Sequence, residues 1–193
     1  MAAILVEKKD HSVIIRFNQP ELRSPLSIAV LEHLSNLIDD IERRAFVERV
    51  IFTGVGDVFA SGADLREIAL VDGNGAREFA LRGQTLMDRI SRITSKTIAA
   101  VNGICFGGAL DLALACDCRI ASPNALLSHP GSSLGIITGW GGTQRLPRLV
   151  GEGIALEMLF TAKRVTADEA LSFGLVDRVA PDPLAAALDT TPT

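Results

Sequence analysis

The stretch VNGICFGGALDLALACD, residues 101–117, decides both the expected fold and the expected site. Residues 98–101 form an apolar run typical of a buried strand, and Gly107 and Gly108 then open an apolar helix. The first backbone N–H groups of a helix have no intrahelical partner and lie at the positive end of its dipole. The sequence therefore predicts backbone donors aimed at one point, with Asp111 beside them on the first helical turn.

A second glycine turn, FASGAD at residues 59–64, has the same character. If the two turns converge, their N–H groups form a pocket with two donors for an oxyanion that develops during a reaction. An acidic side chain next to such a pocket is suited to general acid–base chemistry. The pair of turns therefore predicts a catalytic or binding site rather than two simple connections.

The composition indicates one domain with a sizeable core, because 48% of the 193 residues are hydrophobic and 22% are charged. The formal net charge is -4, and no basic run is longer than two residues. Binding to nucleic acid requires clustered Lys and Arg to neutralise phosphates. The sequence therefore argues against a nucleic-acid partner.

The same composition points to a cytoplasmic protein. No apolar stretch reaches the roughly 18 residues that span a bilayer, and the N-terminus lacks the basic region that opens a signal peptide. The three cysteines are an odd and sparse count, which indicates free thiols in a reducing compartment. We expect no membrane partner and no metal site.

Predicted strands alternate with predicted helices, which is the pattern of an α/β fold. Apolar residues repeat at helical spacing over residues 27–43, and Thr166 with Glu169 forms a capping-box motif. We expect a core domain over residues 1–181 and a frayed tail over residues 182–193. The predicted strands are residues 3–8, 12–17, 50–53, 96–101, 118–122 and 125–128, and the predicted helices are residues 27–43, 64–70, 76–93, 108–115, 142–149, 153–160 and 166–173.

Four segments together resemble the crotonase family, also called the enoyl-CoA hydratase/isomerase family. Their order and spacing match along the whole chain, so the combination is far more specific than any one segment. The segments are FASGADLREI (59–68), AAVNGICFGGALDLALACD (99–117), LGIITGWGGTQRLPRLVG (134–151) and TADEALSFGLVDRVAP (166–181).

The resemblance implies a crotonase-like superhelix of ββα repeats with two roughly perpendicular sheets and, here, a shortened C-terminal helical segment. It also implies an acyl-CoA thioester as substrate, with no separate cofactor because CoA enters as part of the substrate. The family's two oxyanion donors fall on the backbone N–H groups of Ala63 and Gly108. Members usually assemble as trimers or dimers of trimers, so we expect a homo-oligomer.

The length of the chain also favours an oligomer. Family members usually continue past a segment like GLVDRVAP (174–181) with helices that cover the acyl pocket. Apolar surface that those helices would cover must be exposed or paired with another chain. Either another subunit supplies the cover, or this sequence is a short form or a piece of a longer one.

The expected catalytic residues depart from the family pattern. Its hydratases normally use two glutamates, and the first falls on Asp111 while the second aligns with Gly131, which has no side chain. Two carboxylates normally divide the work of adding water to a double bond. His129 is the nearest replacement, with a reference pKa of about 6.5. Asp111 and His129 are therefore the candidate catalytic residues, and hydratase activity is left in doubt.

Further residues are expected to bind the substrate. Arg66 matches a family position that often carries a Lys near the 3′-phosphate of CoA, and a guanidinium pairs with phosphate at least as well. The alternative for Arg66 is a solvated surface charge. The complete set of expected substrate-binding residues is Ala60, Gly62, Asp64, Arg66, Gly107, Gly131, Ser132 and Trp140.

The leading prediction is an enzyme of fatty acid metabolism of the enoyl-CoA hydratase/isomerase type, a lyase or an isomerase, that works through a stabilised enolate. An alternative on the same scaffold is a double-bond isomerase, for which one carboxylate can take and return the proton. A decarboxylase and a thioesterase are further alternatives on this scaffold. An alternative of a different class is a catalytically silent subunit that binds acyl-CoA or serves assembly.

Overall fold

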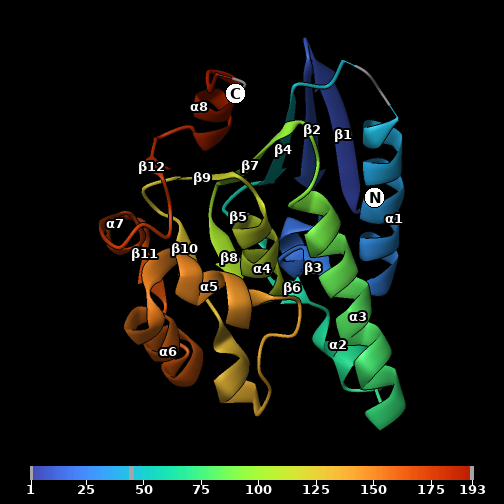
Figure 1. Ribbon diagram of the computed structural model, residues 1–193, viewed down its shortest axis with the longest axis vertical. Helices are drawn as coiled ribbons and strands as arrows, with labels where there is room; N and C mark the ends of the chain where they lie inside the picture. Colours follow the sequence, from blue (N-terminus) through green and yellow to red (C-terminus); the bar gives the residue numbers. More distant parts are fainter. Residues whose placement is uncertain (1, 44–45, 192–193) are drawn as a thin grey trace.

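The chain folds as repeated strand–strand–helix units, seen in the computed structural model over residues 2–43 and 46–191 (Figure 1). In the pairs β4–β5, β7–β8 and β9–β10, the first strand joins a six-stranded sheet of order β1-β2-β4-β7-β9-β12, and the second joins a four-stranded sheet of order β11-β10-β8-β5. The last pair is reversed, because β11 joins the four-stranded sheet and β12 the six-stranded one. A third, two-stranded sheet pairs β3 with β6. The predicted α/β class and the ββα repeat are confirmed.

Short strands and helices alternate along the described residues. The strands are β1 (Ile4–Lys9), β2 (Ser12–Phe17), β3 (Pro25–Leu26), β4 (Arg49–Gly54), β5 (Val58–Ala60), β6 (Gly62–Ala63), β7 (Lys96–Val101), β8 (Ile104–Phe106), β9 (Cys118–Ala121), β10 (Leu126–Ser128), β11 (Val165–Thr166) and β12 (Arg178–Val179). The helices are η1 (Pro20–Leu22), α1 (Ile28–Glu42), α2 (Leu65–Ile68), α3 (Gly73–Ile90), α4 (Gly108–Ala115), η2 (Pro130–Leu134), α5 (Gly142–Val150), α6 (Glu152–Thr161), α7 (Ala167–Ser172) and α8 (Pro183–Leu188).

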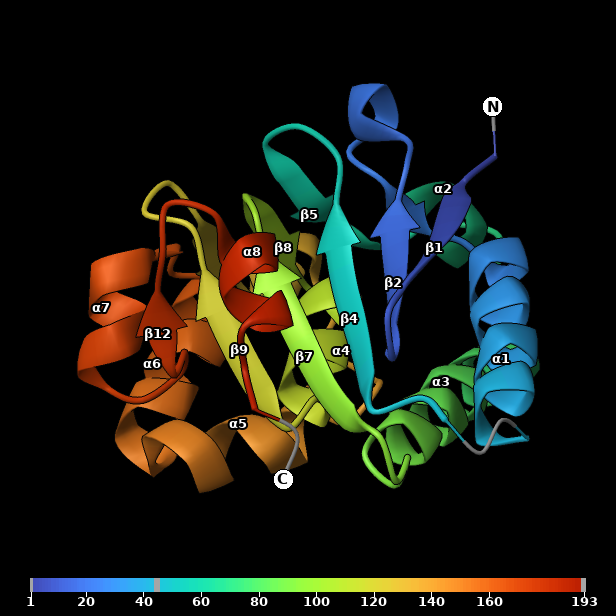
Figure 2. The same ribbon diagram turned by 90° about the horizontal axis from the view of Figure 1, so that it is seen from above.

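The six-stranded sheet is apolar on both faces. Successive side chains along its central strands point to opposite faces, and both sets of side chains are apolar. Ile14, Ile51 and Ile98 are paired across β2, β4 and β7 and belong to one buried cluster. Their neighbours Ile15 and Phe52 belong to the other cluster, which also contains α4. Figure 2 shows α8 and α4 on opposite sides of β7. A sheet buried on both faces needs such near-continuous apolar strands.

The predicted frayed tail over residues 182–193 is wrong for most of its length. Asp182 caps α8 by accepting a hydrogen bond from the Ala185 backbone N–H at 2.9 Å. Ala186 and Ala187 are buried against the isoleucine face of the six-stranded sheet. This second apolar face of the sheet needs a cover, and α8 supplies it. Residues 192–193 lie outside the described part of the chain.

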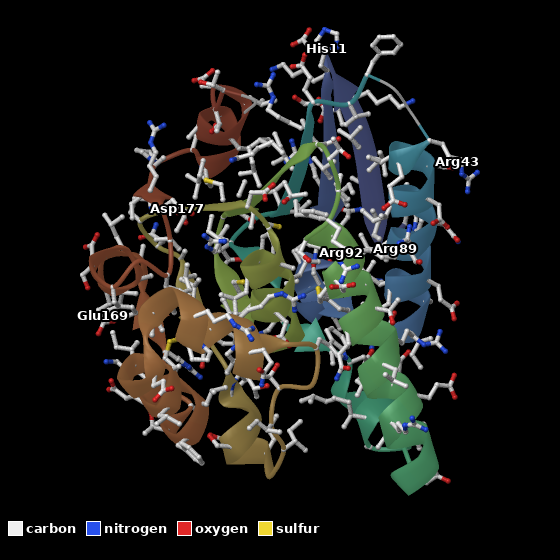
Figure 3. All side chains as sticks on the ribbon, in the orientation of Figure 1. His11, Arg43, Arg89, Arg92, Glu169 and Asp177 are labelled. Carbon is white, nitrogen blue, oxygen red and sulfur yellow. The ribbon has the colours of Figure 1, made fainter. Side chains whose placement is uncertain are left out.

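Helix starts follow the predicted capping signals. Thr166 with Glu169 completes the predicted capping box at α7, and the structure also shows Ser27 capping α1 by accepting from the Val30 N–H. Helices α1 and α3 lie side by side in Figure 1. Arg89 of α3 (labelled in Figure 3) joins them by binding the carboxylates of Asp39 and Glu42 on α1. In the parts of the chain described above, no helix is long and apolar enough to cross a membrane.

The end of the buried helix α4 is tied to β7 by Asp117. Its Oδ2 accepts hydrogen bonds from the Thr97 backbone N–H at 2.7 Å and from the Thr97 hydroxyl at 2.8 Å. The Thr97 hydroxyl oxygen in turn accepts from the Asp117 N–H at 2.9 Å. These bonds fix the axis of α4 against the sheet, and therefore fix where its other end lies.

Candidate active site

The first turn of α4 presents its backbone at a partly open point of an otherwise buried helix. Residues 109–115 are buried, whereas Gly107 and Gly108 are half-buried. Gly107 has a φ of 54°, which favours glycine, and its N–H donates to the Ser128 carbonyl at 2.9 Å. Because Gly108 is the first residue of α4, its N–H has no acceptor within the helix.

The second glycine turn reaches the same point. Gly62 has a φ of 87°, and a Cβ on this residue would lie 2.6 Å from the Phe106 carbonyl oxygen and 2.7 Å from the Gly108 nitrogen. Such contacts are too short for any side chain, so only glycine fits. Gly62 precedes the half-buried Ala63 within β6, which contacts α4. The two turns predicted from the sequence therefore meet at the N-terminus of α4.

Gly62→Ala is expected to destabilise the protein by about 3 kcal/mol or more, because it adds a clash to an unfavourable backbone angle. The matched control is Gly56→Ala, since Gly56 has a φ of +68° but a Cβ there meets nothing within 4 Å. The control is expected to cost about 1 kcal/mol. Urea unfolding measures both losses. Equal losses for the two variants would show that the contact with α4 is not tight.

Asp111 lies one turn into α4 and is fully buried, with a relative exposure of 0%. Its Oδ2 accepts hydrogen bonds from the Thr138 hydroxyl and from the Trp140 backbone N–H, the latter at 3.2 Å. Burial strips water from the carboxylate and raises its pKa from 3.8 to about 6, against the opposing effect of these two hydrogen bonds. Such a carboxyl can exchange a proton near neutral pH.

His129 lies beside Asp111 and is also buried, with an exposure of 2%. Its Nε2 is 3.6 Å from Asp111 Oδ1, which is too long for a hydrogen bond. Burial lowers the pKa of His129 to about 4, so the imidazole is neutral at pH 7. The structure therefore brings the two predicted catalytic residues together as a carboxyl and a neutral imidazole.

Gly131 and Ser132 lie next on the chain, in η2. The Gly131 carbonyl accepts the Ile136 N–H at 3.0 Å, and a Cβ on Gly131 would lie 2.7 Å from the Ile136 carbonyl oxygen. This closed turn leaves no room for a longer side chain without a shift of the backbone. Ser132 is exposed, and no hydrogen bond joins its side chain to Asp111 or His129 within the described ranges.

Trp140 forms a buried wall beside the α4 turn. A Cβ on Gly108 would lie 2.3 Å from the indole, and a Cβ on Gly83 of α3 would lie 2.1 Å from it. The ring centroid is 5.6 Å from that of Phe79, also on α3. Trp140 therefore packs into a slot between α3 and α4 that two glycines leave open, while its backbone N–H holds Asp111.

The remaining expected substrate-binding residues divide into one exposed cation and two buried residues. Arg66 has 72% of its side chain exposed and pairs with Asp64, with Nη2 2.6 Å from Oδ2. Asp64 also caps α2, and the hydrogen bond from Arg66 lowers its pKa. Ala60 is fully buried in the core, so the structure does not bring it to an accessible surface. Arg66 is therefore exposed on α2 but is held by Asp64.

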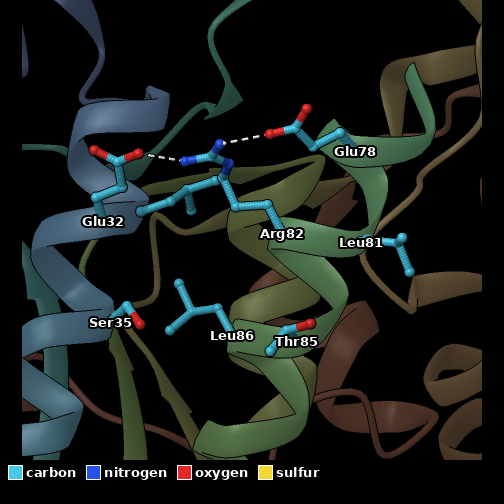
Figure 4. Close-up of a pocket in the computed structure, with 8 residues that line it drawn as sticks. Glu32, Ser35, Glu78, Leu81, Arg82, Thr85 and Leu86 are labelled. Carbon is cyan, nitrogen blue, oxygen red and sulfur yellow. Dashed lines mark hydrogen bonds and ion pairs between the residues drawn. The ribbon is translucent and has the colours of Figure 1, made fainter. Parts of the chain in front are cut away.

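A groove of about 390 Å³ lies elsewhere, between α1 and α3 (Figure 4). Arg82 spans its rim by binding Glu32 and Glu78. None of the expected site residues lines this groove. Within the described residues, no cluster of three or more His, Cys, Asp or Glu side chains is placed to hold a metal ion.

Sequence reasoning missed the parts played by Thr138, Gly142 and Arg145. Thr138 holds Asp111 from 27 positions along the chain, and a Cβ on Gly142 would lie 2.2 Å from Asp111 Oδ1. The charge of Arg145 acts on Asp111, and its Nη1 donates to the Trp140 carbonyl at 3.3 Å. The GWGGTQR run marked this region as part of the resemblance, but no spacing rule assigned these contacts.

Comparisons with known proteins point to one family. A family model described as enoyl-CoA hydratase/isomerase matches residues 7–189. The chain is 40% identical to the short-chain-enoyl-CoA hydratase of Clostridium acetobutylicum over 177 residues, which cover 91% of this chain and 68% of that protein. It is equally similar to the crotonyl-CoA hydratase of Syntrophomonas wolfei, with 40% identity over 177 residues and the same shares of 91% and 68%.

A solved structure gives the same result. The crystal structure of an enoyl-CoA hydratase from Bacillus anthracis superposes with a TM-score of 0.92 at 40% identity, over 97% of this chain and 74% of that one. This chain thus spans about two thirds of the length of the Clostridium and Syntrophomonas relatives, at 68% for each.

Proposed function

Because this chain belongs to the enoyl-CoA hydratase/isomerase family, we propose that it acts on an acyl-CoA thioester through an enolate that the Ala63 and Gly108 backbone N–H groups stabilise. The observation that carries this proposal is the contact of the two glycine turns, with Gly62 against the Gly108 nitrogen. An enolate is the costly species when a proton moves next to a thioester, and two preorganised donors at a helix N-terminus lower that cost by several kcal/mol.

Asp111 is the group we assign to proton transfer at the α-carbon. It lies one helical turn beyond Gly108, and its buried carboxyl has a pKa of about 6. A general acid or base works best when its pKa is near the operating pH. The named relatives are hydratases of short-chain enoyl-CoA and crotonyl-CoA, and we propose an enoyl-CoA of similar kind as the substrate here.

The test is to incubate the protein with crotonyl-CoA and a panel of other acyl-CoA thioesters, and to follow hydration and α-proton exchange in deuterium oxide. Hydration supports a lyase, and exchange without hydration favours an isomerase. Release of free CoA favours a thioesterase, and release of carbon dioxide from a carboxylated thioester favours a decarboxylase. No turnover of any thioester would reject an enzyme of this kind.

The second candidate is a catalytically silent subunit that binds acyl-CoA. Gly131 favours it, because the position aligned with a second catalytic glutamate carries no side chain. Calorimetry with CoA and butyryl-CoA separates the two proposals, since binding without any turnover supports the silent subunit.

Arg66→Ala is expected to weaken CoA binding by about threefold to tenfold, in the range of one partly exposed contact between a cation and a phosphate. The guanidinium is exposed and is held by Asp64. Calorimetry with CoA measures the loss, and Arg66→Lys is the matched control that keeps the charge. With 3′-dephospho-CoA the loss is expected to vanish. An equal loss with both ligands would place Arg66 away from the 3′-phosphate.

We also propose that the chain assembles as a homo-oligomer, a trimer or a hexamer. Leu134, Leu156 and Phe160 are exposed apolar residues on η2 and α6, which lie in contact. Exposed apolar residues that form a contiguous patch mark an interaction site, whereas singly exposed ones do not. Sedimentation at micromolar concentration tests this, and a single species of 20.5 kDa would contradict it. A cytoplasmic location and the lack of a separate cofactor stay predictions.

A further inference from the structure

Among the described residues, the buried side-chain nitrogen and oxygen atoms that lack a hydrogen-bond partner all belong to one pair of residues. They are Asp111 Oδ1, His129 Nδ1 and His129 Nε2. A buried polar atom without a partner is costly, and most such atoms in folded proteins are paired with protein groups or ordered water. All three atoms lie on two side chains whose relative exposures are 0% for Asp111 and 2% for His129. This concentration therefore indicates a site for a polar ligand.

Gly142 packs directly against the pair. A Cβ on this residue would lie 2.2 Å from Asp111 Oδ1, 2.8 Å from the Thr138 methyl group and 2.9 Å from His129 Nε2, so both polar atoms face the bare Cα of Gly142. A side chain at position 142 would displace one or both of them. The other carboxylate oxygen, Oδ2, is already engaged by Thr138 and Trp140, so the carboxylate is oriented with Oδ1 toward the imidazole.

The separation of the two atoms suits one small shared ligand. Asp111 Oδ1 and His129 Nε2 are 3.6 Å apart, too far for a mutual hydrogen bond. A water molecule to one side of the line between them can hydrogen-bond to both at about 2.8 Å. The pair thus offers a carboxylate acceptor and an imidazole nitrogen to the same oxygen.

We propose that Asp111 and His129 hold one water molecule between Oδ1 and Nε2, and that this water is the nucleophile when the enzyme hydrates an enoyl-CoA. The assignment rests on the proposed function. It gives His129 the task of a second catalytic residue, which Gly131 cannot perform because it has no side chain.

The step balances without a further reactant. The water oxygen bonds to the β-carbon while one water proton passes to Asp111 Oδ1. The π electrons of the double bond move toward the thioester oxygen and form the enolate. Asp111 then returns the proton to the α-carbon. His129 fixes the water through Nε2 and ends the step unchanged.

The test compares two reactions of one enzyme, because hydration needs the water and α-proton exchange needs only Asp111. His129→Leu is expected to lower the rate of crotonyl-CoA hydration by about 100-fold, within the range for a positioned catalytic group. Exchange of the α-protons of butyryl-CoA in deuterium oxide is expected to change less than about threefold. His129→Gln, which places a polar atom near the position of Nε2, is expected to restore hydration at least tenfold over His129→Leu.

His33→Leu, the same substitution at an exposed histidine of α1, is the matched control and is expected to leave both rates unchanged. If His129→Leu does not fold, His129→Asn replaces it, because its amide lies near Nδ1 rather than Nε2 and should hydrate more slowly than His129→Gln.

The outcomes separate this inference from the proposed function. Wild-type exchange without wild-type hydration overturns the water site and leaves the enolate proposal standing. Hydration and exchange that fall in parallel in the His129 variants also overturn it, since they indicate a structural role. A wild type that catalyses neither reaction rejects the proposed enzyme and this assignment with it.

Discussion

Asp111→Asn is expected to lower both hydration and α-proton exchange by about 100-fold or more, the usual range for loss of a general acid or base. Asparagine keeps the shape of the side chain, and its amide oxygen can still accept from Thr138 and Trp140, which bind Oδ2 in the wild type. The amide cannot take up the transferred proton. Steady-state rates with crotonyl-CoA and exchange rates with butyryl-CoA measure the loss.

The matched control is Asp117→Asn, which changes the same chemical group just past the other end of α4. Asp117 bonds Thr97 and has no contact with the proposed site. This variant is expected to keep its turnover at some cost in stability. An unchanged rate in Asp111→Asn would remove Asp111 from the mechanism.

The same substitution at Asp111 is expected to stabilise the fold at pH 8 by up to about 3 kcal/mol, at 1.36 kcal/mol for each unit of pKa. The folded protein raises the pKa of Asp111 from 3.8 to about 6, mainly because burial disfavours the charged form. Between these two values the unfolded chain loses its proton first, so stability falls as the pH rises through this window. The loss is complete above pH 6, and asparagine removes it.

Urea unfolding of both proteins from pH 3.5 to pH 8 checks this prediction. The advantage of the variant should shrink as the pH falls below 6 and should vanish below 3.8. The lowered pKa of His129 acts in the opposite sense, because stability is lost as the pH falls from 6.5 toward about 4. This effect is common to both proteins and largely cancels. The attraction between Arg145 and the Asp111 carboxylate is lost in the variant, and it is already part of the pKa of about 6. A variant less stable than the wild type at pH 8 would contradict a buried, costly carboxylate.

Local patterns were enough to predict the α/β class and the two turns of the site. The glycines at 62, 107 and 108 interrupt apolar runs and so mark the two turns in the sequence. Glycine is needed at 62 and 107 because both residues have a positive φ angle. The position of Asp111 then followed from the helix period. These signals are local in sequence, so a single chain carries them in full.

The environment of Asp111 could not be read in the same way. Asp111 lies beside the neutral imidazole of His129 and accepts a hydrogen bond from the Thr138 hydroxyl. Both residues come from segments outside α4, and no periodicity links them to this helix. Sequence reasoning also missed α8, although Asp182 at its N-cap, Pro183 and the alanines are local helix signals. The contact of α8 with the six-stranded sheet is tertiary, like the environment of Asp111, and local patterns do not predict such contacts.

The indole of Trp140 couples two positions that are remote in the chain. Glycine inside a long helix such as α3 is unfavourable by itself. Gly83 is nevertheless required, because a side chain there would occupy the space of the indole, and the same holds for Gly108 on the facing helix. Position 83 can therefore gain a side chain only when position 140 gives up its large ring. Among related proteins, positions 83 and 140 should therefore vary together. A design that enlarges the side chain at position 83 must also replace the indole at position 140.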